Sequence, residues 1–381
     1  MKKRVLFFIN GLYGGGAEKV LQTLLYHIDH NKFDVTLYGL RKEQLSTDYP
    51  ANITYRHIFA GGETNANLIK NLLIKIINKF ILIVYHHFSP RLFYRLFVRG
   101  EYDTEVAFIE GYATRILSGS TNRKSRKLAW VHIDLHENHW TDLAYHNHQE
   151  EETAYHKFDR ILCVSETVKA QLARLYPSIT SSLEVCYNPV DEKRIRSLAE
   201  APLSNEHFLR AGTTFVSIGR LVPQKGYDRL VRIAKELRDE GYDFAINILG
   251  EGSDRNMLES FIRDNNLQNH VRLLGFESNP YPYLKSADVF VCSSRSEGYS
   301  TAITEALILG KAIVTTEVSG AREQLGENRL GIITDNDEQS LLQGIKMMLS
   351  NDNTCLYSNM AEAHGINMSI SESISHIENM L

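Results

Sequence analysis

A buried strand, a polar loop and a helix follow one another between residues 288 and 310, and this order restricts the fold more than any other feature. Residues 288–292 (DVFVC) are a short apolar run, typical of a strand that is buried on both faces. Residues 301–310 (TAITEALILG) predict a helix that is closed by Gly310. A loop between a strand and a helix turns backbone N–H groups toward a bound phosphate. The stretch therefore predicts an α/β fold with an anion-binding edge.

Two carboxylates flank this turn, Glu297 in the loop and Glu305 inside the helix. The residues between them would rise roughly 10 Å along a helix, at about 1.5 Å per residue. Glycosidases with paired catalytic carboxyl groups hold them closer, at about 5–5.5 Å or about 6.5–9.5 Å. We therefore expect the two side chains to bind the two ends of one long ligand. A nucleotide sugar has that shape, with a hexose at one end, a ribose at the other and a diphosphate between them.

A Glu, seven residues and a second Glu after a buried strand resemble the donor-site motif of the family-4 retaining glycosyltransferases, which have the GT-B fold. The resemblance covers nearly the whole chain and is weakest between residues 61 and 100. It implies that Glu297 binds sugar hydroxyls and Glu305 the ribose. The donor-binding turn between them consists of Gly298, Tyr299, Ser300 and Thr301. The alternative is an exposed loop Glu and a solvated helix Glu that bind nothing.

A second candidate phosphate site is the glycine-flanked loop at residues 219–226 (GRLVPQKG), between an apolar strand at 213–218 and a helix that begins at Tyr227. Arg220 and Lys225 in this loop can neutralise a diphosphate, both in binding and as charge builds on the leaving group. A structural Arg and a surface Lys are the alternative. Gly-Arg-Leu, three residues and Lys-Gly closely match the phosphate-binding segment of the same family.

The same resemblance implies two further donor contacts in this half of the chain. Gly250 begins a glycine turn after the strand expected at 244–249, and family members place this turn near the nucleotide. Phe276 follows the strand expected at 271–275, where the base often sits.

The N-terminus is a further strand, glycine loop and helix. Residues 4–9 (RVLFFI) predict a central parallel strand, and the glycines at 14–16 precede a helix that runs to about His30. The loop lacks the G-x-G-x-x-G spacing of a dinucleotide site, and the second strand is not followed by an acid for the ribose. A dinucleotide oxidoreductase is therefore disfavoured. By resemblance to the family, Gly15 and Gly16 lie under the sugar-phosphate of the donor and beside the acceptor.

Residues 127–131 (KLAWV) predict another strand, which ends at His132. A residue at the carboxyl end of a parallel strand faces the ligand. In the family a His at such a strand end lies near the donor sugar, and His132 is the best match, although a His that only caps the strand is the alternative. His136 and His139 follow closely, but they lack a Cys or HExxH frame, so we do not expect a zinc site there.

Residues 64–100 contain six Lys or Arg and no acid, among many aliphatic and aromatic residues. Lys75 and Lys79 interrupt the apolar run every four residues, which places both on one helical stripe. Basic amphipathic helices of this kind often lie in the membrane interface, and each cation near an anionic surface adds about 1 kcal/mol. Membrane contact would suit a lipid-linked acceptor. A helix pair that packs in the core with a basic edge is the alternative.

Composition sets the remaining limits. A chain of 381 residues suggests two domains, and a net charge of −4 does not indicate a nucleic-acid binder. The four cysteines lack metal-site spacing and suggest free thiols in a reducing compartment. No apolar run reaches the ~18 residues of a membrane span. We expect a cytoplasmic enzyme on the inner face of the cell membrane. The triplet at 335–337 (DND) is expected to cap a helix, so we expect no required metal or other cofactor.

Together these features predict two doubly wound α/β domains that face each other across a cleft, as in GT-B enzymes. The acceptor domain is expected at 1–190, with a C-terminal helix at 365–381 packed back on it, and the donor domain at 191–364. The expected reaction is retaining transfer of a hexosyl or N-acetylhexosaminyl unit, probably from a UDP-sugar, to a glycan or polyprenyl-linked acceptor of a cell-envelope polysaccharide such as capsule. Glu297, His132, Arg220 and Lys225 are the expected catalytic residues. A nucleotide-sugar 2-epimerase of the same fold and a non-catalytic partner subunit remain alternatives.

Overall fold

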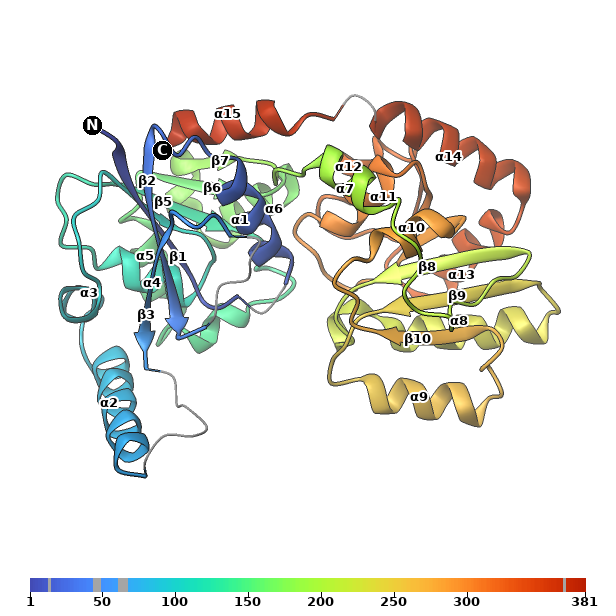
Figure 1. The fold of residues 1–381 in the computed structure, drawn as a ribbon, viewed down its shortest axis with the longest axis horizontal. Helices are drawn as coiled ribbons and strands as arrows, with labels where there is room; N and C mark the ends of the chain where they lie inside the picture. The colour runs from blue at the N-terminus through green and yellow to red at the C-terminus, as the bar shows by residue number, and fades with distance from the viewer. Residues whose placement is uncertain (13–14, 44–48, 61–67, 366–367) are drawn as a thin grey trace. The chain divides into compact units, whose positions relative to one another are not determined.

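The structure, a computed structural model, describes residues 1–12, 15–43, 49–60, 68–365 and 368–381. The chain forms two compact units (Figure 1). Unit 1 consists of residues 1–189 and 371–381, and unit 2 of residues 190–370. Each unit contains a parallel sheet with helices on both of its sides.

The described strands of unit 1 form one parallel seven-stranded sheet in the order β3-β2-β1-β4-β5-β6-β7. The strands are β1 (Lys3–Ile9), β2 (Phe33–Arg41), β3 (Thr54–Phe59), β4 (Thr104–Ala107), β5 (Arg126–Val131), β6 (Arg160–Cys163) and β7 (Leu183–Val185). Chain order reverses between β1 and β4, and ligands of such sheets bind where the strands on either side of the reversal end. The segments after β1 and β4 are therefore candidates for a ligand site, and the segment after β5 lies next to them in the sheet order.

Helices connect these strands and cover both faces of the sheet (Figure 1). They are α1 (Gly16–His27), α2 (Leu68–His87), α3 (Pro90–Phe97), α4 (Tyr112–Ser118), α5 (His148–Tyr155), α6 (Glu166–Leu175) and the 3₁₀ helices η1 (Trp140–Leu143) and η2 (Pro177–Ser182). The last helix, α15 (Ile370–Met380), packs on unit 1 with Ile374 and Ile377 buried. The Asp29 N–H donates to Glu378 at 2.7 Å, and the Thr104 hydroxyl donates to the carbonyl of Leu381.

Unit 2 contains, in its described part, a parallel six-stranded sheet in the order β10-β9-β8-β11-β12-β13. The strands are β8 (Thr213–Ile218), β9 (Phe244–Leu249), β10 (Val271–Gly275), β11 (Val289–Cys292), β12 (Ala312–Thr316) and β13 (Ile332–Thr334). Here the reversal falls between β8 and β11, which are paired neighbours. The loops that follow these two strands therefore meet at one point on the edge of the sheet.

The helices of unit 2 follow its strands in turn. They are α7 (Glu192–Leu198), η3 (Pro223–Lys225), α8 (Tyr227–Asp239), α9 (Arg255–Asp264), α10 (Tyr281–Ser286), α11 (Thr301–Ile308), α12 (Ala321–Leu325), α13 (Glu338–Met348) and α14 (Asn351–Gly365). One apolar cluster lies on the α8 side of the sheet, around Phe215, Ile246 and Val291. A second cluster lies under α10 and α11, around Val216 and Phe290. Successive residues of β8, Phe215 and Val216, thus belong to the clusters on opposite faces of the sheet, as expected of a strand buried on both sides.

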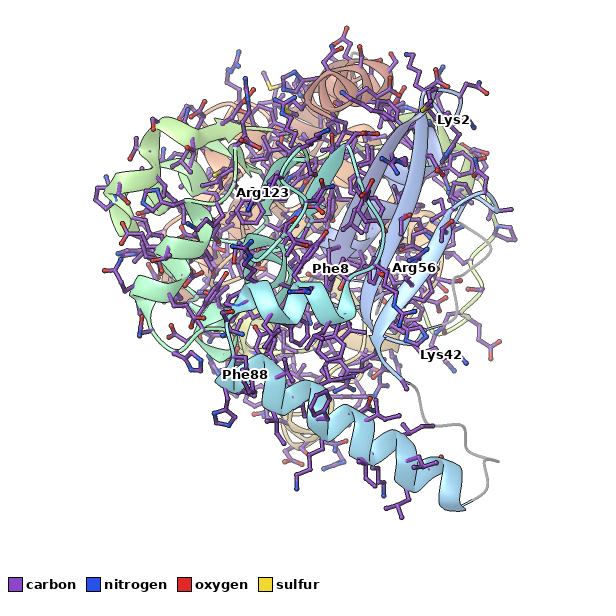
Figure 2. The ribbon with its side chains drawn as sticks, turned by 90° about the vertical axis from the view of Figure 1, so that its left-hand side faces the viewer. Lys2, Phe8, Lys42, Arg56, Phe88 and Arg123 are labelled. Carbon is purple, nitrogen blue, oxygen red and sulfur yellow. The ribbon has the colours of Figure 1, made fainter. Side chains whose placement is uncertain are left out.

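Helix α2 extends away from the sheet of unit 1, as the light blue helix of Figure 2 shows. One face of its C-terminal half anchors it. Ile81 and Tyr85 on this face are buried, the Tyr85 hydroxyl donates to the Ala144 carbonyl at 2.8 Å, and Asn78 bonds both backbone groups of Ala60. The buried guanidinium of Arg115 stacks on the Tyr85 ring, 4.3 Å from its centroid.

The outward face of α2 is apolar and exposed. Five side chains on it have exposed fractions between 50% and 59%, and they are Leu72, Leu73, Ile76, Ile77 and Phe80. Lys75 and Lys79 are exposed beside them. The core-packed alternative therefore fails for this face and holds only for the anchored one. Across the ranges that the structure describes, no helix combines the length and hydropathy needed to span a membrane.

Two elements differ from the sequence expectations. Strand β3 was not expected, since it is an edge strand of mixed burial in which one residue of six, Ile58, is buried. The sequence at 183–188 (LEVCYN) predicts a strand through residue 188, but β7 ends at Val185 and also lies at a sheet edge. Edge strands carry a weaker apolar pattern because only part of their surface is covered.

Candidate functional site

In unit 2, Glu297 lies in the loop between β11 and α11 and is paired with the lysine of the β8 loop. Lys225 Nζ lies 2.5 Å from Glu297 Oε1, and the Ser294 hydroxyl donates to the same oxygen at 2.6 Å. Both charged side chains are mostly shielded, with 21% of Lys225 and 11% of Glu297 exposed. Two segments 72 residues apart in sequence are thus joined by one ion pair.

Gly226 explains how the two loops come so close. It has a φ of +67°, and a Cβ at this position would overlap the carbonyl oxygen of Ser293. The Ser293 hydroxyl donates to the Lys225 carbonyl at 2.8 Å. Buried Arg229 donates to the carbonyls of both Ser293 and Ser294. The sequence did not single out Arg229, although a buried Arg at the start of a helix after a phosphate loop is a usable signal.

The electrostatics of the pair favour a charged lysine. Burial is the largest single effect and lowers the pKa of Lys225, but Glu297, through its charge and its hydrogen bond, and Cys292 together outweigh burial, so the pKa lies above its ordinary value. The charge of Arg220 also acts on Lys225, so the two cations are within electrostatic range of each other. Arg220 itself is exposed at the mouth of the loop. Two cations beside one carboxylate leave this corner able to accept an anionic ligand.

The glycine turn after β9 packs directly on the β8 loop. Gly250 has a φ of +142°, and a Cβ there would overlap the carbonyl oxygen of Gly219. The Gly250 N–H donates to the Gly275 carbonyl at 2.7 Å, which joins the ends of β9 and β10. Beyond that end, the Phe276 ring is 70% exposed. An exposed aromatic face beside the β8 loop can stack on a base.

The helix start expected at Ser300 and Thr301 is confirmed: Ser300 is the N-cap of α11, and no side chain caps the first turn. Glu305 is 3% exposed in the second turn and accepts from the Tyr281 hydroxyl at 3.4 Å. The two acids therefore have different surroundings, because Glu297 pairs with Lys225 whereas Glu305 lies inside the helix packing. Gly298 and Tyr299 pack against Gly320, where a Cβ would lie 2.9 Å from the Gly298 carbonyl oxygen.

The triplet at 335–337 is a capping element, as expected. The Asp337 carboxylate accepts from the Ser340 N–H at 2.8 Å at the start of α13. Asn336 accepts from Arg229 at 2.9 Å and donates to the Arg295 carbonyl. The triplet therefore contacts the loop after β11 through the Arg295 carbonyl and contacts Arg229 of α8.

In unit 1, His132 directly follows β5. Its ring stacks on Trp130 at an interplanar angle of 13°, and Phe108 lies 5.0 Å away. Burial lowers the pKa of His132 to about 3, so the imidazole is neutral near pH 7. Nε2 is buried and has no hydrogen-bond partner in the described part of the chain. An uncharged ring with an open nitrogen can exchange a hydrogen bond with a sugar hydroxyl.

Glu110, three residues after the end of β4, is a functional candidate that the sequence analysis missed. Its Oε2 accepts from the His132 N–H at 2.9 Å, and its Oε1 accepts from Trp140 Nε1 at 3.1 Å. Burial raises the pKa of this carboxyl group to about 7. Glu110 follows a central strand next to the topological reversal, and that position was the available signal.

The remaining expected residues of unit 1 are the glycines before α1. Gly15 is the N-cap of α1 in an extended conformation, and Gly16 is its first residue. A Cβ at Gly15 would overlap the carboxylate of Glu18, so the first turn is closely packed. Gly14, also part of the expected loop, lies outside the described residues.

Comparisons with known proteins now decide the family. Residues 14–194 match the description "Glycosyltransferase Family 4", and residues 205–364 match "Glycosyl transferases group 1". The chain is 29% identical over 354 residues to the N-acetylgalactosamine-N,N'-diacetylbacillosaminyl-diphospho-undecaprenol 4-alpha-N-acetylgalactosaminyltransferase of Campylobacter jejuni, covering 91% of this chain and 90% of that one. The chain belongs to the family-4 glycosyltransferases.

Solved structures show the GT-B fold for this glycosyltransferase. Anabaena HepE in complex with UDP and glucose superposes with a TM-score of 0.72 at 16% identity, over 99% of both chains. Sucrose-phosphate synthase of Thermosynechococcus elongatus superposes with a TM-score of 0.75 at 14% identity, over 100% of this chain and 98% of that one. At such identities the likeness concerns the fold alone.

Proposed function

We propose that this glycosyltransferase moves a hexosyl or N-acetylhexosaminyl unit from a UDP-sugar to a lipid-linked glycan acceptor, with retention at the anomeric carbon. The acceptor belongs to the synthesis of a cell-envelope polysaccharide such as capsule. The main support for donor binding is the Lys225–Glu297 pair at the β8–β11 reversal, with Arg220 within electrostatic range of Lys225. HepE, which shares the fold, was solved with UDP and glucose.

In this proposal each candidate residue of the two units has one role. Lys225 and Arg220 bind the diphosphate and stabilise the charge that grows on it as the sugar leaves. Glu297 binds a sugar hydroxyl and Glu305 the ribose hydroxyls, while Phe276 and Gly250 lie beside the nucleoside. Gly15, Gly16 and the turn from Gly298 to Thr301 contribute backbone N–H groups to the donor. His132 contacts a hydroxyl of the transferred sugar through Nε2.

Retention is proposed from the resemblance to the family-4 retaining glycosyltransferases, and the occupation of the two acids argues against a covalent intermediate. Glu297 Oε1 already holds Lys225 and Ser294, and Glu305 is buried in α11, so neither carboxylate suits attack on an anomeric carbon. Because neither carboxylate suits that attack, we assign the proposed retention to same-face displacement, in which the leaving phosphate takes the proton of the acceptor hydroxyl. The protein then acts by positioning and by charge stabilisation.

Donor binding and product analysis test this function. Excess UDP-sugar at ~100 times Kd should stabilise the protein by about 2.7 kcal/mol. NMR of the product formed on a polyprenyl-diphosphate glycan should show the donor's anomeric configuration. An inverted product would overturn the mechanism. Formation of a 2-epimer and free UDP without acceptor would instead establish the epimerase alternative, and no binding of any nucleotide sugar would support the partner-subunit alternative.

We also propose that the outward face of α2 contacts the membrane that carries the acceptor. The face joins exposed apolar side chains, among them Ile76 and Ile77, to Lys75 and Lys79. A cavity of about 570 Å³ lies at the base of the same helix and is lined by Leu82, Tyr85 and Phe93, with Arg41, Lys42 and His86 also lining it. An apolar wall with basic side chains suits a lipid with a diphosphate head group.

Vesicle binding tests the membrane contact. Ile76→Glu with Ile77→Glu should abolish co-sedimentation with vesicles that contain anionic lipid, because it puts charge on the inserting face. Met257→Glu on α9, also at an exposed apolar residue, is the matched control and should bind like the wild type. Equal binding by both variants would remove the contact while leaving the donor assignment standing.

A further inference from the structure

Two short helices of unit 1 bring four potential metal ligands into one place. His139 and Asp142 are three residues apart on η1 and its N-cap, and His148 and Glu151 are three residues apart on α5. Residues at this spacing lie on the same side of a helical turn. The sequence therefore contains H-x-x-D, five residues and H-x-x-E, a pattern that a search for Cys or HExxH overlooks.

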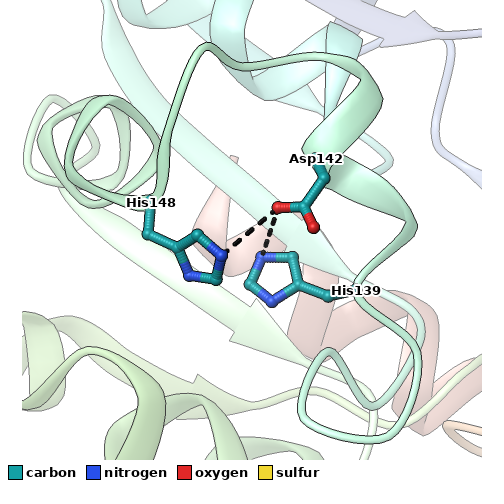
Figure 3. A group of neighbouring side chains, drawn as sticks. All are labelled: His139, Asp142 and His148. Atoms are coloured by element: carbon teal, nitrogen blue, oxygen red, sulfur yellow. Dashed lines mark ion pairs between the residues drawn. The ribbon is translucent and has the colours of Figure 1, made fainter.

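Three ligand atoms of this group converge (Figure 3). The distances from Asp142 Oδ1 are 3.4 Å to His148 Nε2 and 3.8 Å to His139 Nε2. One ligand atom from each of these three residues lies within 4.8 Å of the others. Ligands of a tetrahedral zinc ion at about 2.0–2.2 Å lie roughly 3.3 Å from one another. The observed separations are close to that value.

Glu151 provides a second, independent observation. Its side chain is 1% exposed, and its Oε2 lies 2.8 Å from His139 Nε2 and accepts from the Tyr176 hydroxyl at 2.9 Å. Its Oε1 is buried and has no hydrogen-bond partner among the described residues. A buried carboxylate with an unsatisfied oxygen is costly unless a positive charge lies nearby. A divalent cation beside His139 would supply that charge.

We propose that His139, Asp142 and His148 bind one Zn²⁺ ion, with the carboxylate of Glu151 beside it. Two neutral imidazoles and two carboxylates balance a divalent cation, and mixed nitrogen and oxygen ligands favour zinc over magnesium or calcium. The site is a structural clip and takes no part in a reaction step. The zinc site is proposed independently of the proposed glycosyl transfer.

The bound ion would hold in place the segment around Trp140, which contacts the candidate residue Glu110. Trp140 directly follows His139 and donates to Glu110, which in turn accepts from the His132 N–H. The ion would join η1, where this segment turns, to the first turn of α5. Zinc binding should therefore raise the thermal stability of the protein and leave the donor corner of unit 2 unaffected.

Direct binding to the untagged full chain tests the site. Calorimetry at pH 7.5 should show one Zn²⁺ per chain, and Co²⁺ should give the visible absorption of a tetrahedral ion. Asp142→Asn and His148→Ala change exposed side chains and should each weaken zinc binding at least roughly tenfold, the size of effect found for partners of metal ligands. His136→Ala and His146→Ala, at exposed histidines of the same segment, are matched controls and should bind like the wild type.

The result that overturns the proposal is equally direct. Absence of stoichiometric zinc binding, or equal affinity in His148→Ala and His136→Ala, would show an ordinary cluster of surface histidines. Zinc binding by a wild-type chain that shows no transferase activity with any nucleotide sugar would keep the zinc site while removing the proposed function. Mg²⁺ should not compete, and displacement of zinc by Mg²⁺ at similar concentration would contradict the ligand assignment.

Discussion

The two units place opposite kinds of chemistry at the same position of the same sheet architecture. At the reversal of unit 2, Lys225 and Glu297 form an ion pair with a second cation, Arg220, nearby. Beside the reversal of unit 1, burial raises the pKa of Glu110 to about 7 and lowers that of His132 to about 3. The ion pair at the reversal of unit 2 thus keeps its charges, whereas burial in unit 1 favours the uncharged forms of Glu110 and His132. Charged groups suit a diphosphate, whereas neutral donors and acceptors suit sugar hydroxyls.

The charged corner should be the more sensitive of the two. Lys225→Ala should lower kcat by about 10²–10³, the usual loss when one charge-stabilising donor is removed. Lys235→Ala on α8 removes an exposed pair with Asp239 and is the matched control, with no expected change in kcat. Steady-state kinetics on the two variants measure the difference. A near-normal kcat for Lys225→Ala would contradict the division into a charged region that is sensitive to mutation and a neutral region that is less sensitive.

The backbone of the charged corner provides the next test. Gly226→Ala should cost about 1–2 kcal/mol for a left-handed residue and about 1–3 kcal/mol more for the overlap with the Ser293 carbonyl. Gly241 also has a positive φ, +83°, but a Cβ there meets nothing within 4 Å. Gly241→Ala should therefore cost only the conformational part. Urea unfolding of both variants separates the two contributions, and equal losses would contradict the close-approach explanation.

The neutral region should respond more weakly. His132→Ala should lower kcat about tenfold, because it removes one neutral hydrogen bond of about 0.5–1.5 kcal/mol. His136→Ala, at an exposed residue four positions later, should have no effect. NMR should detect no protonation of His132 between pH 7 and pH 5, since burial lowers its pKa to about 3. Protonation near pH 6.5 would show that the ring is solvated.

The smallest expected effect is a pH dependence of stability. Glu110 has a raised pKa in the folded state, so the folded protein binds more protons than the unfolded chain between pH 4.5 and about 7. The stability from this group is fully present below pH 4.5 and is lost as pH rises through about 7. Unfolding free energies of wild type and Glu110→Gln should therefore change relative to each other across this window.

The comparison between the two proteins removes the opposing contribution of His132. Its pKa is lowered to about 3, so its own effect makes stability rise with pH between about 3 and 6.5. The unfolding free energy of the wild type minus that of Glu110→Gln should fall as pH increases. A constant difference would show that Glu110 titrates normally and is not desolvated.

The sequence by itself determined the parts that depend on short-range patterns. Apolar runs marked β8, β9 and β10 at their observed bounds, and the glycine-flanked loop at 219–226 marked the start of α8 at Tyr227. The glycine-flanked loop with Lys225 and the loop with Glu297 were both recognisable, because each lies within one strand–loop–helix segment. Conformational rules for Gly and apolar periodicity act over a few residues, so a single sequence reveals them.

Only the tertiary structure decided which of these groups meet and in what charge state. The ion pair joins residues 72 apart because parallel pairing places β8 next to β11. Glu110 is a candidate because the fold brings the His132 N–H and Trp140 Nε1 to its carboxylate, and the cluster of His139, Asp142 and His148 forms because two helical turns face each other. Burial and long-range contact set the pKa of a side chain, and neither is encoded in its immediate neighbours.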